Sequence, residues 1–129
     1  MPAFQGTHYA QAAAGPCSGI ISTGDAYQGG KVAYILQSGD PGYDANFCKG
    51  LIAATSDQST GIRWDNGSDI TTTEATETDI GTRPTNTNDI ISSQGGVAGS
   101  YAAEICADSS VTEGGVTYDD WFLPSKDEL

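Results

Sequence analysis

Positively charged side chains are scarce in this chain. Of its 129 residues, five are lysine or arginine and 17 are aspartate or glutamate, which gives a formal net charge of −12 at pH 7. A surface of this sign repels phosphate backbones and anionic lipid headgroups. We therefore expect no nucleic-acid partner, whereas cations, neutral sugars and proteins with basic patches are compatible with the charge.

Long apolar runs are absent as well. No segment approaches the roughly 18 apolar residues of a bilayer-spanning helix, so we expect no membrane insertion. The length is that of a single domain, and it is large enough to bury a hydrophobic core.

Histidine and cysteine are too few and too scattered to suggest a reactive centre. The chain has one histidine, His8, and three cysteines, Cys17, Cys48 and Cys106, with neither CxxC spacing nor a histidine cluster. Zinc binding and Cys–His catalysis are therefore poorly supported. The odd number of cysteines leaves three arrangements open: one disulfide with one free thiol, three buried thiols, or an intermolecular bridge.

Acidic pairs are the remaining candidates for catalysis. Pairs such as Asp119–Asp120 could act as acid and base, but they arise by chance in a chain this acidic. The serines lack a nearby histidine base. We expect a protein that is not an enzyme.

The sequence predicts few regular elements. Residues 1 to 24 are small, polar and interrupted by glycine, which indicates an irregular, flexible arm with a short strand at residues 19 to 22. The β-branched and aromatic run at residues 32 to 36 predicts a buried strand, and residues 51 to 55 predict a second strand that pairs with it. Residues 62 to 64 suggest a short strand that ends at the turn Asp65 to Asp69.

Two helices are expected in the second half of the chain. The first begins near Thr87 or Asn88, with Asn86 or Asn88 as its cap. The second lies within the stretch GSYAAEICADSS at residues 99 to 110, where Tyr101, Ala102, Ile105 and Cys106 fall at helical spacing and Ser100 can act as the cap.

The C-terminal stretch YDDWFLPSKDEL permits two interpretations. Its last four letters match an endoplasmic-reticulum retrieval signal, which a receptor reads only when it hangs free in solvent. The apolar Trp121 to Leu123, then Pro124, and a capping-box spacing between Ser125 and Glu128 instead predict packed scaffolding that enters a helix, with Leu129 facing the core. We interpret the KDEL ending as coincidental.

Several motifs together resemble the Lcl C-terminal-like domains, a family of bacterial extracellular modules related to the C-type-lectin and formylglycine-generating-enzyme fold. The motifs are YQGGKVAYIL, GLIAATSDQSTGIRW, IGTRPTNTNDII, SYAAEICAD and GGVTYDDWFLPSKDEL, and they run in family order from residue 27 to residue 129. The resemblance implies an α+β fold with a C-type-lectin-like core, a mixed or antiparallel sheet and two short helices over residues 25–129, preceded by the arm at 1–24.

The chain departs from this family at its C-terminal end. Family members continue past the Glu-Leu pair into further strands, the last of which pairs with the first strand of the domain. We therefore expect a domain that is incomplete at the C-terminus, with its strand from Gly30 onward lacking a neighbour. A second chain, or the arm near residues 19 to 22, is the expected replacement, because an open buried edge is costly and adhesive.

The resemblance also suggests a function: a secreted or surface-displayed recognition or adhesion domain that binds glycans or another surface. Trp64 could stack on a sugar ring, although a core position is the simpler interpretation for a tryptophan. Asp65, Asn66 and Asp69 offer oxygen ligands that suit calcium, against the default of an ordinary Asn-Gly turn. The alternative function is a structural subunit of an extracellular filament or surface array, a homo-oligomer assembled by strand or arm exchange.

Overall fold

The structure, a computed structural model, describes residues 7–14, 21–67, 78–80, 83–95 and 99–128. Within these ranges the protein has mixed α+β architecture, with antiparallel sheets and two short α helices, as the sequence predicted. The elements in chain order are β1 (Thr7–Ala14), β2 (Ala26–Tyr27), β3 (Gly30–Ile35), β4 (Phe47–Ala54), α1 (Arg83–Gln94), α2 (Ala102–Ala107), β5 (Val111–Glu113), β6 (Val116–Tyr118) and the 3₁₀ helix η1 (Lys126–Glu128).

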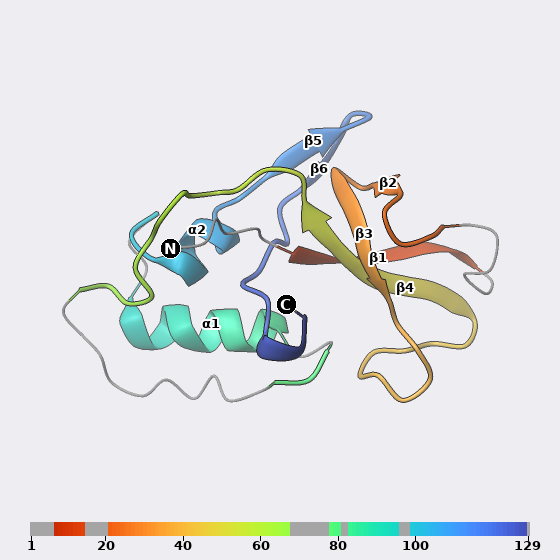
Figure 1. The fold of residues 1–129 in the computed structure, drawn as a ribbon, viewed down its shortest axis with the longest axis horizontal. Coiled ribbons are helices and arrows are strands. Elements are labelled where there is room, and N and C mark those ends of the chain that lie inside the picture. The colour runs from red at the N-terminus through yellow and green to blue at the C-terminus, as the bar shows by residue number, and fades with distance from the viewer. Residues whose placement is uncertain (1–6, 15–20, 68–77, 81–82, 96–98, 129) are drawn as a thin grey trace.

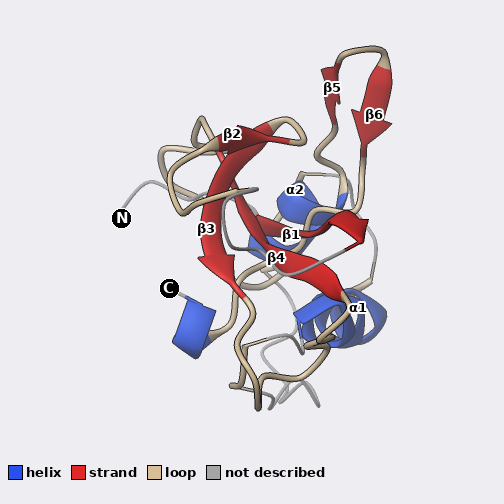
Figure 2. Ribbon diagram, turned by 90° about the vertical axis from the view of Figure 1, so that its right-hand side faces the viewer, coloured by secondary structure: helices blue, strands red, loops and turns tan. Residues whose placement is uncertain are grey.

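Four strands form the main sheet, in the order β1-β4-β3-β2, and each neighbouring pair is antiparallel. The strands β5 and β6 form a separate two-stranded hairpin. In Figure 1 the main sheet lies on the right, the two α helices lie on the left, and the C-terminal segment runs between them. Figure 2 shows the β5–β6 hairpin extending away from the helices.

Glycines allow close approach at the start of β3. A Cβ on Gly30 would lie 2.4 Å from the carbonyl oxygen of Ala53 and 2.5 Å from Cγ2 of Ile52, both on β4. The preceding turn joins β2 to β3 through Gln28 and Gly29, whose φ angles are 49° and 80°. Positive φ at both central residues is the property of a type I′ hairpin turn. Gly29 therefore permits the turn, and Gly30 permits the close contact of β3 with β4.

Two apolar clusters lie in the core of the described part of the chain. The first joins the sheet to the tail and contains Val32, Ile52, Ala54 and Trp121. The second lies around α2 and contains Tyr101, Ala102, Ala103 and Leu123. Because Trp121 and Leu123 belong to different clusters, the C-terminal segment links the sheet to the helices.

The C-terminal residues pack as part of the domain. Trp121 is 3% exposed and Leu123 is 9% exposed, and Pro124 is half-buried. The backbone N–H of Ser125 donates to Oε2 of Glu128 at 2.8 Å, which is one half of the expected capping box, while the Ser125 hydroxyl donates to the carbonyl of Thr78 at 2.9 Å. The helix that follows is a single 3₁₀ turn, and Leu129 lies outside the described residues.

The N-terminal region differs from the irregular arm that was predicted. Residues Thr7–Ala14 form β1 and pair antiparallel with β4, with a register irregularity between Gln11 and Ala14. An alanine-rich segment has weak strand propensity, but its pairing with β4 outweighs that weakness. The composition of the segment does not reveal this pairing. The short strand expected at residues 19 to 22 is not found at Ile21 and Ser22, and residues 19 and 20 lie outside the described ranges.

The predicted lack of a neighbour for the first long strand is wrong. β3 pairs with β4 on one side and with β2 on the other, where Ala26 faces Lys31 and Tyr27 faces Gly30. Two backbone hydrogen bonds continue the pairing on the β2 side of β3. The Val32 N–H donates to the Asp25 carbonyl, and the Gly24 N–H donates to the Val32 carbonyl. β2 therefore fills the edge of β3 that was expected to be open, and it is joined to β3 by the short turn through Gln28 and Gly29.

Three local predictions also need correction. Residues 62 to 64 form no strand, and α1 begins at Arg83, four residues before Thr87. Pro84, which suits the first turn of a helix, was the missed start signal. The N-cap of α2 is Tyr101, which makes no side-chain capping bond, and the Ser100 hydroxyl that was expected to cap it is buried without a hydrogen-bond partner.

Candidate functional site

Trp64 is the most exposed of the large apolar side chains among the described residues. It is 62% exposed, on a loop that leaves β4 and passes the two α helices. The core position, which was the simpler interpretation of this residue, is therefore wrong. The indole ring is a large flat apolar surface with a polar N–H group, and at this exposure it is accessible to a ligand.

Hydrogen bonds fasten the Trp64 loop to both helices. The side-chain amide of Asn66 donates to the carbonyl of Gln94 at 2.6 Å, and the backbone N–H of Asn66 donates to Oε1 of the same residue at 3.2 Å. Gln94 is the last residue of α1 and is only 8% exposed. On the other side of the tryptophan, the carbonyl of Arg63 accepts from the backbone N–H of Ala102, the first residue of α2, at 3.0 Å. The residues on both sides of Trp64 are thus held in place.

Asp65 stabilises the turn that follows the tryptophan. Its Oδ1 accepts the backbone N–H of Gly67 at 2.7 Å, and the Arg63 Nε lies 3.8 Å from the same oxygen. Both side chains of this ion pair are substantially exposed, so the pair contributes about 0–1 kcal/mol and mainly orients the guanidinium. One carboxylate oxygen is therefore already engaged in holding the loop.

The predicted calcium ligands are only partly brought together. Asp65 and Asn66 are adjacent in the held loop, and Asp69 lies outside the described residues. Within the described part of the chain, no group of three or more histidine, cysteine, aspartate or glutamate residues could hold a metal ion. Calcium normally takes six to eight oxygen ligands, which these two residues alone do not supply.

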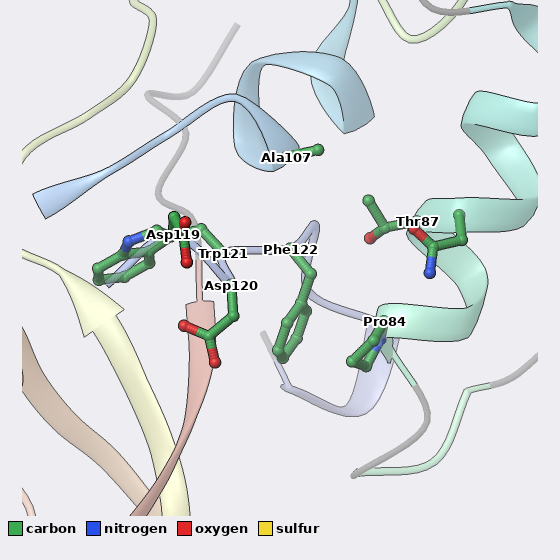
Figure 3. A pocket seen from close by; sticks show the side chains of 8 residues that line it. Pro84, Thr87, Ala107, Asp119, Asp120, Trp121 and Phe122 are labelled. Atoms are coloured by element: carbon green, nitrogen blue, oxygen red, sulfur yellow. The ribbon is translucent and has the colours of Figure 1, made fainter. Parts of the chain in front are cut away.

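A pocket of about 290 Å³ opens on another part of the molecule (Figure 3). It lies between the start of α1, the end of α2 and the segment before the buried tail. Its lining residues are Pro84, Thr87, Asn88, Ala107, Asp119, Asp120, Trp121 and Phe122. Asp119 and Asp120 are exposed, whereas Phe122 is buried, so the carboxylates lie toward solvent and the Phe122 ring lies deeper.

Sequence reasoning missed this pocket. The sequence alone presents Asp119–Asp120 as a chance acidic pair, because part of the lining comes from α1, which lies far from the pair in the chain. Pro84 and Thr87, for example, are more than 30 positions away. No local spacing signals such a site, because it exists only once α1 packs beside the tail. The contact is visible in the bond from the Leu123 backbone N–H to the buried Thr87 hydroxyl, at 3.0 Å.

The cysteines have separate structural roles. Cys48 is disulfide-bonded, while Cys106 is a free thiol with no exposed surface. The remaining cysteine, Cys17, lies outside the described residues. Burial raises the pKa of the Cys106 thiol to about 12, so this thiol stays protonated at neutral pH and is a poor nucleophile.

Comparisons with protein-family models, with curated proteins and with solved structures found no match. None of the helices in the described ranges has the length and apolar character needed to cross a membrane.

Proposed function

We propose that this protein is an extracellular bacterial recognition or adhesion domain, with a C-type-lectin-like core, that binds a glycan or a similar surface through the region around Trp64. The observation that carries the proposal is a tryptophan that is 62% exposed and is flanked by two residues, Arg63 and Asn66, that hydrogen bonds hold to the helices. The resemblance of five ordered motifs to Lcl C-terminal-like domains supports the same role and the same fold.

The chemistry of the Trp64 region suits a neutral sugar. An indole ring offers a flat apolar face on which the C–H face of a pyranose can stack, and polar side chains beside it can bind the hydroxyl groups. Arg63 and Asp65, the chain neighbours of the tryptophan, carry exposed side chains with hydrogen-bonding groups. Because the loop is already ordered by its bonds to Gln94 and Ala102, binding would require little further ordering of the protein.

The cysteine chemistry supports the proposed location outside the cytoplasm. Cys48 lies on β4 and is disulfide-bonded. Disulfides form and persist in oxidising compartments and at cell surfaces, and they are rare where glutathione and thioredoxin keep thiols reduced. An extracellular or surface location is consistent with this bond.

A glycan array, probed with and without EDTA, tests the proposal. We expect binding to a limited set of glycans, and loss of that binding on EDTA treatment would identify a calcium requirement. The variant Trp64→Ala should weaken binding by roughly tenfold or more, which is the scale of one lost stacking contact. Tyr43→Ala is the matched control, because Tyr43 is also an exposed aromatic residue, at 43%.

Three results would contradict the glycan proposal. They are a folded sample that binds no glycan, a Trp64→Ala variant that binds as tightly as the unchanged protein, and a Tyr43→Ala variant that loses binding to the same extent as Trp64→Ala. The last result would show that the effect comes from any loss of exposed aromatic surface and does not belong to the Trp64 loop.

A second candidate function is a structural subunit that assembles by arm exchange. The observation that favours it is the position of β1, a strand at the edge of the sheet that pairs with β4. An edge strand can be exchanged into the same position of a neighbouring copy at low cost. Light scattering over a wide concentration range tests this function: dimers or filaments would support it, and a monomer at every concentration would remove it.

A further inference from the structure

The pocket between α1, α2 and the Asp119–Phe122 segment has a chemistry of its own. We propose that it binds an organic cation, namely a guanidinium or ammonium group carried on a short aliphatic stem. The two sources of this chemistry are an arginine or lysine side chain of a partner protein and a free small amine. The inference does not depend on glycan binding at Trp64.

The size of the pocket limits what it can hold. Its volume of about 290 Å³ is at the lower end of ligand pockets, which span about 300–1,000 Å³. A single side chain or a small amine fits such a space, whereas an oligosaccharide does not. The pocket is therefore suited to one anchoring group.

The lining separates an apolar interior from a charged opening. Pro84 and the buried Phe122 supply apolar surface, whereas the indole ring of Trp121 lies beyond the two aspartates and packs in the sheet cluster. Asp119 and Asp120 are exposed, and Figure 3 shows both carboxylates on the side of the pocket opposite Pro84. A cation on an aliphatic stem matches both parts, because its methylene groups can cover apolar surface while its charged head pairs with carboxylates.

The sign of the charge favours a cation over an anion. None of the described residues that line the pocket is basic, and two of them are aspartates. The N-terminal end of α1 contributes the opposite sign, but a helix terminus carries only about half an elementary charge. The net charge of −12 on the whole chain also disfavours an anion.

The pocket and the Trp64 loop lie at opposite ends of α1. Pro84 is the second residue of this helix, whereas Gln94, which binds the Trp64 loop, is the last. At 1.5 Å of rise per residue the two positions are separated by about 15 Å along the helix. Substitution in one site should therefore leave the other intact.

The test is a titration of the full chain, followed by two-dimensional NMR of the backbone amides. The probes are agmatine, which is a free guanidinium amine, and the capped peptide acetyl-Gly-Arg-Gly-amide; the uncharged probe is N-butylurea. We expect saturable shifts at residues 119 to 122 and at Thr87 and Asn88 with at least one cation, and no saturable shifts with the urea. Binding of agmatine alone identifies a small amine as the ligand, and binding of the peptide identifies a side chain.

Charge variants test the role of the carboxylates. Asp119→Asn should weaken binding of the cation by roughly tenfold, because it removes a charge-assisted hydrogen bond. Asp57→Asn is the matched control, since it removes the same charge from an exposed position just after β4. An absence of saturable shifts with both cations, or an equal loss of affinity in the two variants, would overturn the proposal.

A neutral variant covers the case in which removal of a carboxylate disturbs the fold. Ala107→Leu enlarges a half-buried residue that lines the pocket and leaves the charge unchanged. We expect it to abolish cation binding while the amide spectrum far from the pocket stays the same; unchanged binding would contradict the assignment. Trp64→Ala should bind agmatine normally, so failure of the glycan proposal and failure of this one are distinguishable.

Discussion

Glu104 is an ionisable residue at a buried position, where its negative charge is unfavourable. It lies on α2 next to the core residue Ala103 and is 6% exposed. Burial, and secondly the negative charge of Asp108, raise the pKa of the Glu104 carboxyl above its usual value of 4.5. A carboxyl whose pKa is raised in the folded state binds its proton more tightly there than in the unfolded chain. Stability is therefore lost as the pH rises from about 4.5 through the folded-state pKa.

This shift predicts that Glu104→Gln stabilises the protein at neutral pH. The amide has similar size and cannot ionise, so the unfavourable buried charge disappears and the melting temperature should rise by up to a few degrees. Thermal unfolding at pH 7 and at pH 4.5 measures the effect, and the advantage of the variant should shrink at the lower pH. Asp57→Asn is the control for a general reduction of negative charge; an equal gain in that variant would contradict the explanation.

At the scale of elements, what could be predicted depended on whether the signal was local. The apolar runs of β3 and β4 were recognised because such runs predict strands wherever they lie. β5 and β6 were missed, although the sequence VTEGGVTY has the form of a hairpin with a Gly-Gly turn, and Gly114 and Gly115 do adopt positive φ angles of 58° and 82°. β1 had no such signal, since only its pairing with β4 defines it.

The contact between β3 and β4 gives a prediction at this scale. In Gly30→Ala the new methyl group would meet the Ala53 carbonyl oxygen at 2.4 Å, so the strands must separate, at a cost of about 1–3 kcal/mol. Chemical denaturation should show this loss in the free energy of unfolding. Gly61→Ala is the matched control, because a Cβ there has no atom within 4 Å and we expect no loss. Equal stability of the two variants would show that the close approach of the strands is not required.

At the scale of the whole molecule, the sequence predicted the α+β class, but neither the geometry of the Trp64 loop nor the pocket beside Asp119 and Asp120. The Trp64 loop depends on Gln94, which lies 28 residues beyond Asn66, and no spacing rule links them. The pocket likewise needs α1, α2 and the tail to meet. Contacts between distant segments are set by packing of the whole chain, which is the information that local patterns lack.

The disulfide at Cys48 links the stability of the whole molecule to its surroundings. Cys48 is 1% exposed on β4, which lies between β1 and β3, so loss of the bond should destabilise the sheet, by about 2–5 kcal/mol as for native disulfides of small secreted domains. Unfolding with and without a reductant measures this loss.

Alkylation followed by peptide mapping supplies the control. Native protein should be modified at neither Cys48 nor Cys106, unfolded protein at Cys106 and not at Cys48, and reduced unfolded protein at both. Modification of Cys48 before reduction would contradict the bond and remove the support that it gives to an extracellular location.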